Sequence, residues 1–182
     1  MARMPYLTKD DLDEADKPLL DRDINLVKAL AHNPAAARAF SHLGGYIRYK
    51  ASLDPRLREL AILQVGYLAK APYEYSHHVK IGFDFGVTEA DIHGLEAESA
   101  GEPSELEPLA KTVLRAAREM TDDGAMAEAT FRELEEALGR PALVDLIVTV
   151  AFYNGVVRLL GSLEIDVEDS YQQYLEQFPL PE

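Results

Sequence analysis

The stretches DPRLRELAIL, residues 54–63, and PYEYSHHVKIGFDF, residues 72–85, decide the fold of this chain. The first opens with a capping aspartate and a proline suited to the first helical position. The second ends directly before Gly86, a residue type that commonly follows the last turn of a helix. Apolar side chains recur in both at helical intervals, so they predict helices over residues 55–70 and 73–85.

The same signals recur outward from this pair. Asn33 precedes Pro34 as a second capping pair, and Gly139 and Pro141 together close one helix and open the next. Further helices are predicted over residues 18–31, 34–50, 88–99, 104–121, 125–138 and 141–162. Strand-like alternation of four or more residues does not occur in the sequence, so the predicted fold class is all-α.

The domain organisation follows from the absence of any linker-like or low-complexity block. Residues 1–182 are predicted to form a single all-helical domain. Residues 1–17 and 167–182 look less regular, and these arms would either wrap a neighbouring subunit or be loosely held. Residues 55–86 and 131–165 both show a helix, a break and a second apolar helix, which suggests a duplicated helical hairpin.

Composition excludes several classes of function. The chain of 182 residues contains no cysteine, which excludes disulfides, thiolate nucleophiles, cysteine-ligated zinc and iron–sulfur clusters. The net charge is −14, from 32 acidic and 18 basic side chains, so nucleic acid and anionic membrane surfaces are not expected as partners. The first residues lack the apolar run of a signal peptide, and a cytoplasmic location is expected. The apolar segment 141–160 is interpreted as a buried core helix.

The 73–85 helix carries the clearest candidate site. Glu74 and His78 lie one turn apart on a face that also holds Ile81 and Phe85, with His77 at its margin. A carboxylate beside an imidazole, among apolar side chains, is suited to general acid–base catalysis. Spacing alone favours a surface helix pair, which contributes only about 0.2–0.5 kcal/mol to stability.

A metal site on this helix is not predicted. Glu74, His77 and His78 are all potential ligands, but the H-E-x-x-H pattern is missing. Adjacent histidines point about 100° apart on a helix, so they cannot share one ion without a third element. No metal and no cofactor are expected, and whether His77 or His78 faces a pocket stays open.

Glu59 is a second candidate acid. On its helix it neighbours Ile62 and Leu63, while Arg56 and Lys70 flank the same face. Spacing alone favours an exposed Glu59 paired with Arg56.

The runs LDPRLRELAIL at 53–63, PYEYSHHVKIGFDFGV at 72–87 and TEADI at 88–92 together resemble the carboxymuconolactone decarboxylase family, which is related to alkylhydroperoxidase D. The resemblance covers residues 35–115 and extends more loosely to Tyr153, Asn154 and Arg158. It implies an alkylhydroperoxidase D-like helical domain that assembles as a trimer or hexamer.

The resemblance also implies roles for particular residues. Glu59 and His78 match the glutamate and histidine of the proton relay in the peroxidase branch. The two cysteines of that branch correspond to Ala71 and Glu74 here, so thiol peroxidase activity is not expected.

The leading hypothesis is therefore a cofactor-free acid–base enzyme that acts on a small carboxylated lactone or a related acid. His78 would move a proton at carbon as carbon dioxide leaves, Glu74 would orient His78, and Glu59 would complete the relay. Arg56 or Arg158 is a candidate for holding a substrate carboxylate, and Tyr73, Tyr75 and Tyr153 are candidates for donating to an oxyanion. For these residues ion pairs and core packing remain the simpler interpretations. Two alternatives stay open: a noncatalytic oligomeric scaffold, and a metal-dependent hydrolase or lyase using His78.

Overall fold

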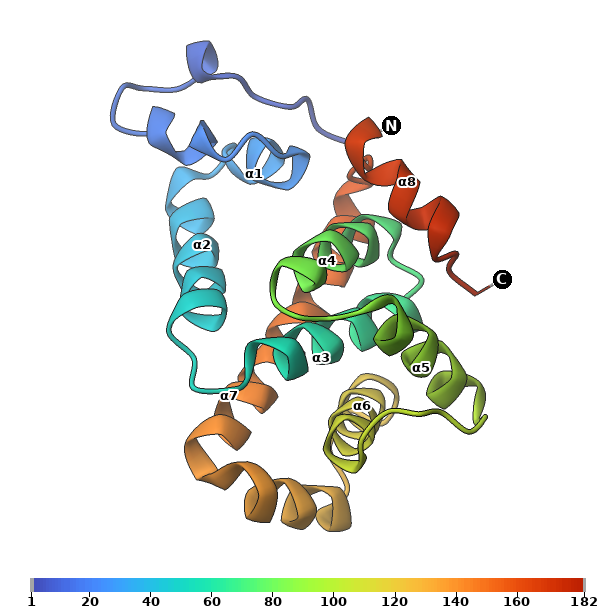
Figure 1. Ribbon diagram of the computed structural model, residues 1–182. Helices are drawn as coiled ribbons and strands as arrows, with labels where there is room; N and C mark the ends of the chain where they lie inside the picture. Colours follow the sequence, from blue (N-terminus) through green and yellow to red (C-terminus); the bar gives the residue numbers. More distant parts are fainter. Residues whose placement is uncertain (1, 182) are drawn as a thin grey trace.

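Helices α3, Pro55–Leu68, and α4, Pro72–Asp84, form a hairpin at the centre of the molecule (Figure 1). The computed structural model describes residues 2–181 of the chain. The Asp54 side chain accepts a hydrogen bond from the Leu57 amide at the start of α3, which is the cap predicted from the sequence. The hairpin fits closely because Gly66 has no side chain: a Cβ atom there would lie 3.3 Å from the Tyr75 nitrogen.

The remaining helices surround this hairpin. In chain order they are the 3-10 turns η1 and η2, at Lys9–Asp11 and Lys17–Asp21, and then α1, Asn25–Leu30, α2, Pro34–Tyr49, α5, Glu89–Ala100, α6, Pro108–Asp122, α7, Glu128–Leu163, and α8, Asp169–Gln177. Within residues 2–181 there is no β-strand, so the all-α prediction is confirmed. Helix α3 packs against α4, α6 and α7, and ten consecutive residues from Leu57 to Gly66 are buried.

Two predictions for the ends of the chain were wrong. The helix predicted over residues 18–31 is divided into η2 and the short α1, because Arg22 and Ile24 are extended. The tail was expected to be irregular, yet it contains α8, which packs on α4 (Figure 1). Tyr174 and Phe178 lie 6.5 Å and 6.2 Å from the Phe83 ring, so an aromatic contact holds the tail.

The N-terminal arm packs against the end of α7 and the residue Asp166 that follows it. The Tyr6 hydroxyl donates a hydrogen bond to Asp166 at 3.0 Å, and the Arg3 amide donates to the Leu163 carbonyl at 2.9 Å. Both arms are therefore packed against the chain's own helices.

Helix α7 bends where the sequence predicted a break. Gly139 adopts φ 73° and ψ 162°, and the helix changes direction there (Figure 1). By length and composition α7 also passes the test for a membrane span, with a mean hydropathy of 1.7 over its most apolar window. Half of this apolar window is buried inside the fold. That burial agrees with the interpretation of residues 141–160 as a core helix.

Candidate functional site

The first turns of α4 place Glu74 and His78 in the interior. Glu74 and His78 are only 3% and 4% exposed, so the surface-pair interpretation of their spacing does not hold. The Nε2 atom of His78 lies 3.0 Å from Oε1 of Glu74. Glu74 is also in the first turn of α4, where the helix dipole favours a negative charge.

Glu59 approaches His78 from the neighbouring helix α3. Its Oε2 atom lies 2.6 Å from Nδ1 of His78, and the Glu59 side chain is fully buried. His78 is thus held between two carboxylates, one at each ring nitrogen. The expected pairing of Glu59 with Arg56 was wrong: Arg56 turns outward to Asp91 and Glu107.

Arg58, and not Arg56, balances the charge of Glu59. Its Nε and Nη2 atoms donate to Oε1 of Glu59 at 2.9 Å and 2.8 Å, and the guanidinium lies over the Phe85 ring at 4.5 Å. A buried Arg–carboxylate fork of this kind fixes the orientation of the acid as well as its charge. The free oxygen of Glu59 is therefore aimed at His78.

These contacts set the protonation of the pair. Burial opposes a charge on His78, but the adjacent carboxylates Glu59 and Glu74 outweigh it and raise the pKa of His78. Burial also opposes a charge on Glu59, yet His78 and Arg58 hold the pKa of Glu59 below its ordinary value. His78 therefore favours the imidazolium form, which stores one proton between two carboxylates.

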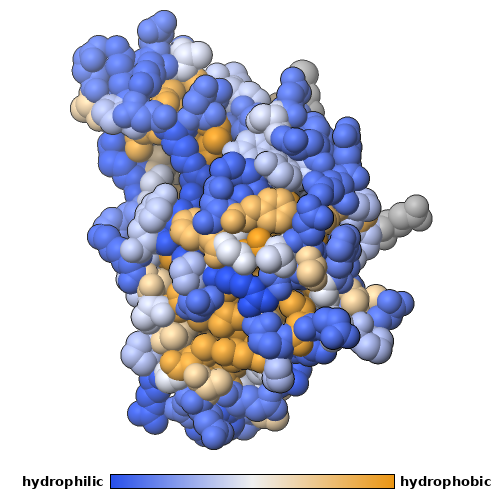
Figure 2. Space-filling model, in the orientation of Figure 1, coloured by the Kyte–Doolittle hydropathy of each residue, from blue (hydrophilic) through white to orange (hydrophobic). Residues whose placement is uncertain are grey.

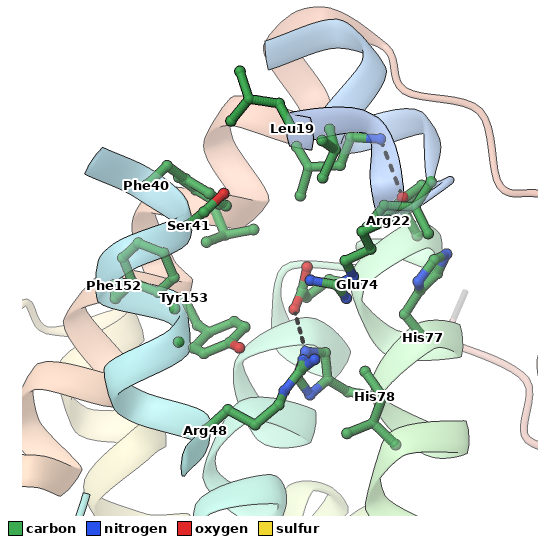
Figure 3. Close-up of a pocket in the computed structure, with 18 of the residues that line it drawn as sticks. Leu19, Arg22, Phe40, Ser41, Arg48, Glu74, His77, His78, Phe152 and Tyr153 are labelled. Carbon is green, nitrogen blue, oxygen red and sulfur yellow. Dashed lines mark hydrogen bonds and ion pairs between the residues drawn. The ribbon is translucent and has the colours of Figure 1, made fainter. Parts of the chain in front are cut away.

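A cavity of about 440 Å³ lies above this pair (Figure 3). Its floor is formed by Glu74, His77 and His78 of α4, and its other walls come from the η2–α1 segment, α2 and α7. The lining residues from those three walls include Leu19, Arg22, Leu26, Phe40, Ser41, Arg48, Tyr49, Phe152, Tyr153 and Val156. The volume is in the range of sites for small organic ligands.

Tyr153 is the predicted tyrosine that the structure brings to His78. Its ring meets the edge of the His78 ring at a centroid distance of 5.0 Å, and the hydroxyl is directed into the cavity (Figure 3). Burial, followed by the charges of Glu74 and Glu59, raises the pKa of Tyr153, so the hydroxyl keeps its proton.

His77 also borders the cavity, but it belongs to a second network. Its Nε2 atom lies 2.7 Å from Oε2 of Glu168, and its ring is stacked between Tyr73 at 4.1 Å and Tyr171 at 3.6 Å. Burial lowers the pKa of His77 despite the contact with Glu168. Both histidines therefore face the cavity, and only His78 touches Glu59 and Glu74.

The remaining predicted residues have other positions. Tyr73 lines the cavity, and its hydroxyl is bound between the Leu26 amide and Glu168, both at 3.2 Å. Tyr75 is fully buried beside Tyr67 and does not line the cavity. Arg158 is exposed, donates to Asn154 one turn earlier and does not line the cavity, so the structure does not bring it to the other site residues.

Sequence reasoning missed several residues of the site and its surroundings. Arg22 and Arg48 lie on separate segments with no pattern that links them to α4. Glu168 is 91 residues from His77, and spacing gives no signal for such a contact. The stripe Tyr171, Tyr174 and Phe178 is helical, however, and could have revealed α8.

The arrangement is suited to moving a proton. Both His78 nitrogens face carboxylates, and Glu74 lines the cavity together with His78, so the Glu74 carboxylate offers a path for a proton between the ring and the cavity. Among residues 2–181, no group of three histidine or acidic side chains is arranged to hold a metal ion.

Comparisons with known proteins agree with this architecture. Residues 34–119 match the model of the carboxymuconolactone decarboxylase family. No curated protein matches the chain significantly in sequence. A peroxidase-related protein of Ralstonia eutropha JMP134 with an alkylhydroperoxidase AhpD core is 18% identical, with a TM-score of 0.79 and coverage of 96% of this chain and 95% of that one.

Two further structures share the fold. A cysteine-to-alanine variant of the debrominase Bmp8, in complex with 2,3,4-tribromopyrrole, is 17% identical, with a TM-score of 0.78 and coverage of 98% and 100%. A peroxidase-related protein of Silicibacter sp. TM1040 is 18% identical, with a TM-score of 0.66 and coverage of 92% and 89%. At these identities the likeness shows the alkylhydroperoxidase D-like fold.

Proposed function

From the match of residues 34–119 to the carboxymuconolactone decarboxylase family, we propose that the chain is a cofactor-free acid–base enzyme of that family. Its substrate would be a small carboxylated lactone or a related organic acid, and its reaction a decarboxylation. The observation that carries the proposal is the position of His78, held 2.6 Å from Glu59 and 3.0 Å from Glu74 at the floor of the cavity.

The proposed reaction needs one proton for each turnover. When the bond between a substrate carbon atom and its carboxylate breaks, the electron pair of that bond stays on the carbon atom and carbon dioxide departs. That carbon must then accept a proton. In our proposal the proton comes from the His78 imidazolium by way of the Glu74 carboxylate, which contacts the ring and also lines the cavity.

Glu59 and Arg58 would support this transfer without touching the substrate. The fork from Arg58 keeps Glu59 ionised, and ionised Glu59 keeps a proton on His78 before the reaction. After the transfer His78 would recover its proton from water that enters the cavity. The Tyr153 hydroxyl is placed to donate to an enolate oxygen that develops in the substrate.

The chain lacks cysteine, so a thiol peroxidase reaction is not proposed. The two alternatives from the sequence differ from our proposal in what they require of this site. A noncatalytic scaffold needs Glu74 and His78 only as a structural network. A metal-dependent hydrolase would need a vacant His78 nitrogen, and both nitrogens are engaged with carboxylates.

The experiment is to incubate the protein with a panel of carboxylated lactones and related acids in deuterated water. Proton NMR would follow loss of the substrate and deuterium at the carbon that carried the carboxylate. We expect Glu74→Gln to lower the rate by about 100- to 10,000-fold, the range for a general acid–base residue. Loss of turnover with undiminished folding in this variant supports the proposal.

The matched control is the exposed pair on α5, where His93 lies 3.0 Å from Glu96. The variant His93→Gln should leave turnover unchanged. Equal turnover in wild type and Glu74→Gln would contradict the proposed mechanism. Absence of turnover across the panel, with the site intact, would favour the scaffold alternative.

A further inference from the structure

Two arginine side chains from separate segments reach the same cavity. Arg22 follows η2, and Arg48 lies in the last turn of α2, yet both line the space in front of α4. Figure 3 shows the Arg22 side chain directed toward Glu74 and the Arg48 side chain extending toward His78. The cavity thus has a cationic side that faces its catalytic floor.

Neither guanidinium has an acidic partner in the part of the chain that the structure describes. Among residues 2–181, Arg56 pairs with two acids and Arg58 pairs with Glu59, whereas Arg22 and Arg48 form no ion pair. Arg48 is half-buried, and its side chain is held by Tyr49. A partly buried guanidinium with donors to spare is well suited to a carboxylate, which it can bind through two parallel hydrogen bonds.

A third donor points into the same space. The Tyr153 side chain is 6% exposed, and its hydroxyl has no hydrogen-bond partner among the described residues. The positive charges of Arg48 and Arg22 both act on this hydroxyl and oppose the rise in the Tyr153 pKa that burial and the glutamates cause. Both guanidinium groups therefore lie near Tyr153.

Another part of the cavity lining is apolar. The rings of Phe40 and Phe152 lie 4.9 Å apart and both line the cavity. A ligand that satisfies both sides needs an apolar or unsaturated body and an anionic end. Inorganic anions would leave the aromatic wall uncovered.

We infer that Arg48 and Arg22 form an anion-binding pair that holds the carboxylate of a small organic acid, with the body of that acid against Phe40 and Phe152. The substrate class is taken from the proposed function, but the binding step does not depend on turnover. The pair takes the role that the sequence suggested for Arg56 and Arg158. Because Arg22 stands on the η2–α1 segment and Arg48 on α2, the bound carboxylate would link two walls of the cavity.

The probe for this inference is benzoate, with benzamide as a neutral molecule of nearly the same shape. Titration calorimetry at constant ionic strength would measure the affinity of each. We expect benzoate to bind at least tenfold more tightly than benzamide. We expect Arg48→Gln and Arg22→Gln each to weaken benzoate by about tenfold or more, since a hydrogen bond to a charged group is worth about 1.5–3 kcal/mol.

The matched control is Arg158→Gln, which removes an exposed arginine that does not line the cavity and should leave the affinity unchanged. Arg48→Lys keeps the positive charge but loses the planar pair of donors that a guanidinium offers to a carboxylate. It should therefore retain only part of the affinity for benzoate. Equal binding of benzoate and benzamide, no binding of benzoate, or unchanged affinity in Arg48→Gln and Arg22→Gln would overturn the inference. In that case the two arginines only balance the charge of Glu74 across the cavity.

The same titration with Glu74→Gln separates this inference from the proposed function. That variant should still bind benzoate, because Glu74 adds a repelling charge and no donor. If wild type binds benzoate through Arg48 but turns over no acid, the proposed function fails and the anion-binding pair stands. If turnover is observed while Arg48→Gln and Arg22→Gln bind benzoate normally, the proposed function stands and the anion-binding pair is overturned.

Discussion

His77 and His78 are consecutive residues, yet their rings lie in separate networks that move their pKa values in opposite directions. Burial lowers the pKa of His77, which is stacked between two tyrosines, even though Glu168 is 2.7 Å away. Burial acts in the same sense on His78, but Glu59 and Glu74 together overcome it and raise its pKa. One α-helical turn therefore carries two imidazoles whose pKa values lie on opposite sides of the ordinary histidine value.

The first prediction is that these two rings titrate separately. Long-range nitrogen–proton NMR spectra, recorded from pH 4 to pH 10 or to the limits of folding, should show His78 protonated above pH 6.5 and His77 neutral below it, 6.5 being the ordinary histidine value. Assignment comes from the variants His77→Gln and His78→Gln. A His78 ring that titrates below 6.5 would remove the stored proton from our mechanism.

The second prediction concerns stability and pH. Because folding raises the pKa of His78, protonated His78 stabilises the folded state fully below pH 6.5 and loses this effect as pH rises through the folded pKa. We expect His78→Gln to lower the free energy of unfolding by about 3–5 kcal/mol at pH 6, the usual cost of breaking a buried charged pair. The difference between wild type and variant should shrink at higher pH.

Urea unfolding at a series of pH values measures this difference. His93→Gln, at an exposed histidine, is the control for loss of an imidazole without burial. A cost for His78→Gln that grows with pH would show that the folded pKa is lowered and not raised.

The third prediction separates Tyr75 from the site. Its hydroxyl is buried without a hydrogen-bond partner among the described residues. Removing an unsatisfied buried polar group costs nothing or stabilises, so Tyr75→Phe should raise the free energy of unfolding by up to about 1 kcal/mol. Turnover and benzoate affinity should not change. A loss of activity in this variant would show that Tyr75 contacts the site in a state other than the one described.

The fourth prediction is that the chain forms a homo-oligomer. The family resemblance of its sequence implies a trimer or hexamer. Apolar side chains are exposed on α2 and α7, with Tyr49 at 74% and Val144 at 56%. Figure 2 likewise shows apolar areas that interrupt a largely polar face. We expect light scattering to give the mass of a trimer or hexamer, and Val144→Arg to reduce it.

The control for this measurement is Gln173→Arg, an exposed position on α8. A monomer whose mass is independent of concentration would count against the assembly. Retention of the full assembly in Val144→Arg would place the interface elsewhere.

Most of the fold could be predicted because its signals are local. The caps at Asn33 and Asp54 and the break at Gly139 all act within one helical turn, and the structure contains each of them. The helix predicted over 18–31 failed because a distant residue determines its break. The Asn25 amide donates to Glu168 at 2.7 Å, across 143 residues of sequence. This contact lets the chain stay extended at Ile24.

The candidate site was predictable only in part, for the same reason. Glu74 and His78 share a helix, so spacing alone brings them together. Glu59 was assigned to the relay by resemblance, whereas its helical neighbours suggested an exposed residue. Its burial depends on how α3 rotates against α4, which no local pattern specifies. Arg22 and Arg48 join the site only through the packing of three separate segments.

The Glu168 carboxylate joins Asn25 near the start of the chain to His77 at the floor of the cavity, from a position near the end. A nascent chain on the ribosome therefore has Glu74 and His78 of α4 long before it has the residue that ties the η2–α1 wall in place. The η2–α1 wall is tied in place only when the segment that carries Glu168 has left the ribosome and α8 docks on α4. Synthesis that stops before Glu168 would thus give a chain with its proton relay present and its ligand-binding wall unsecured.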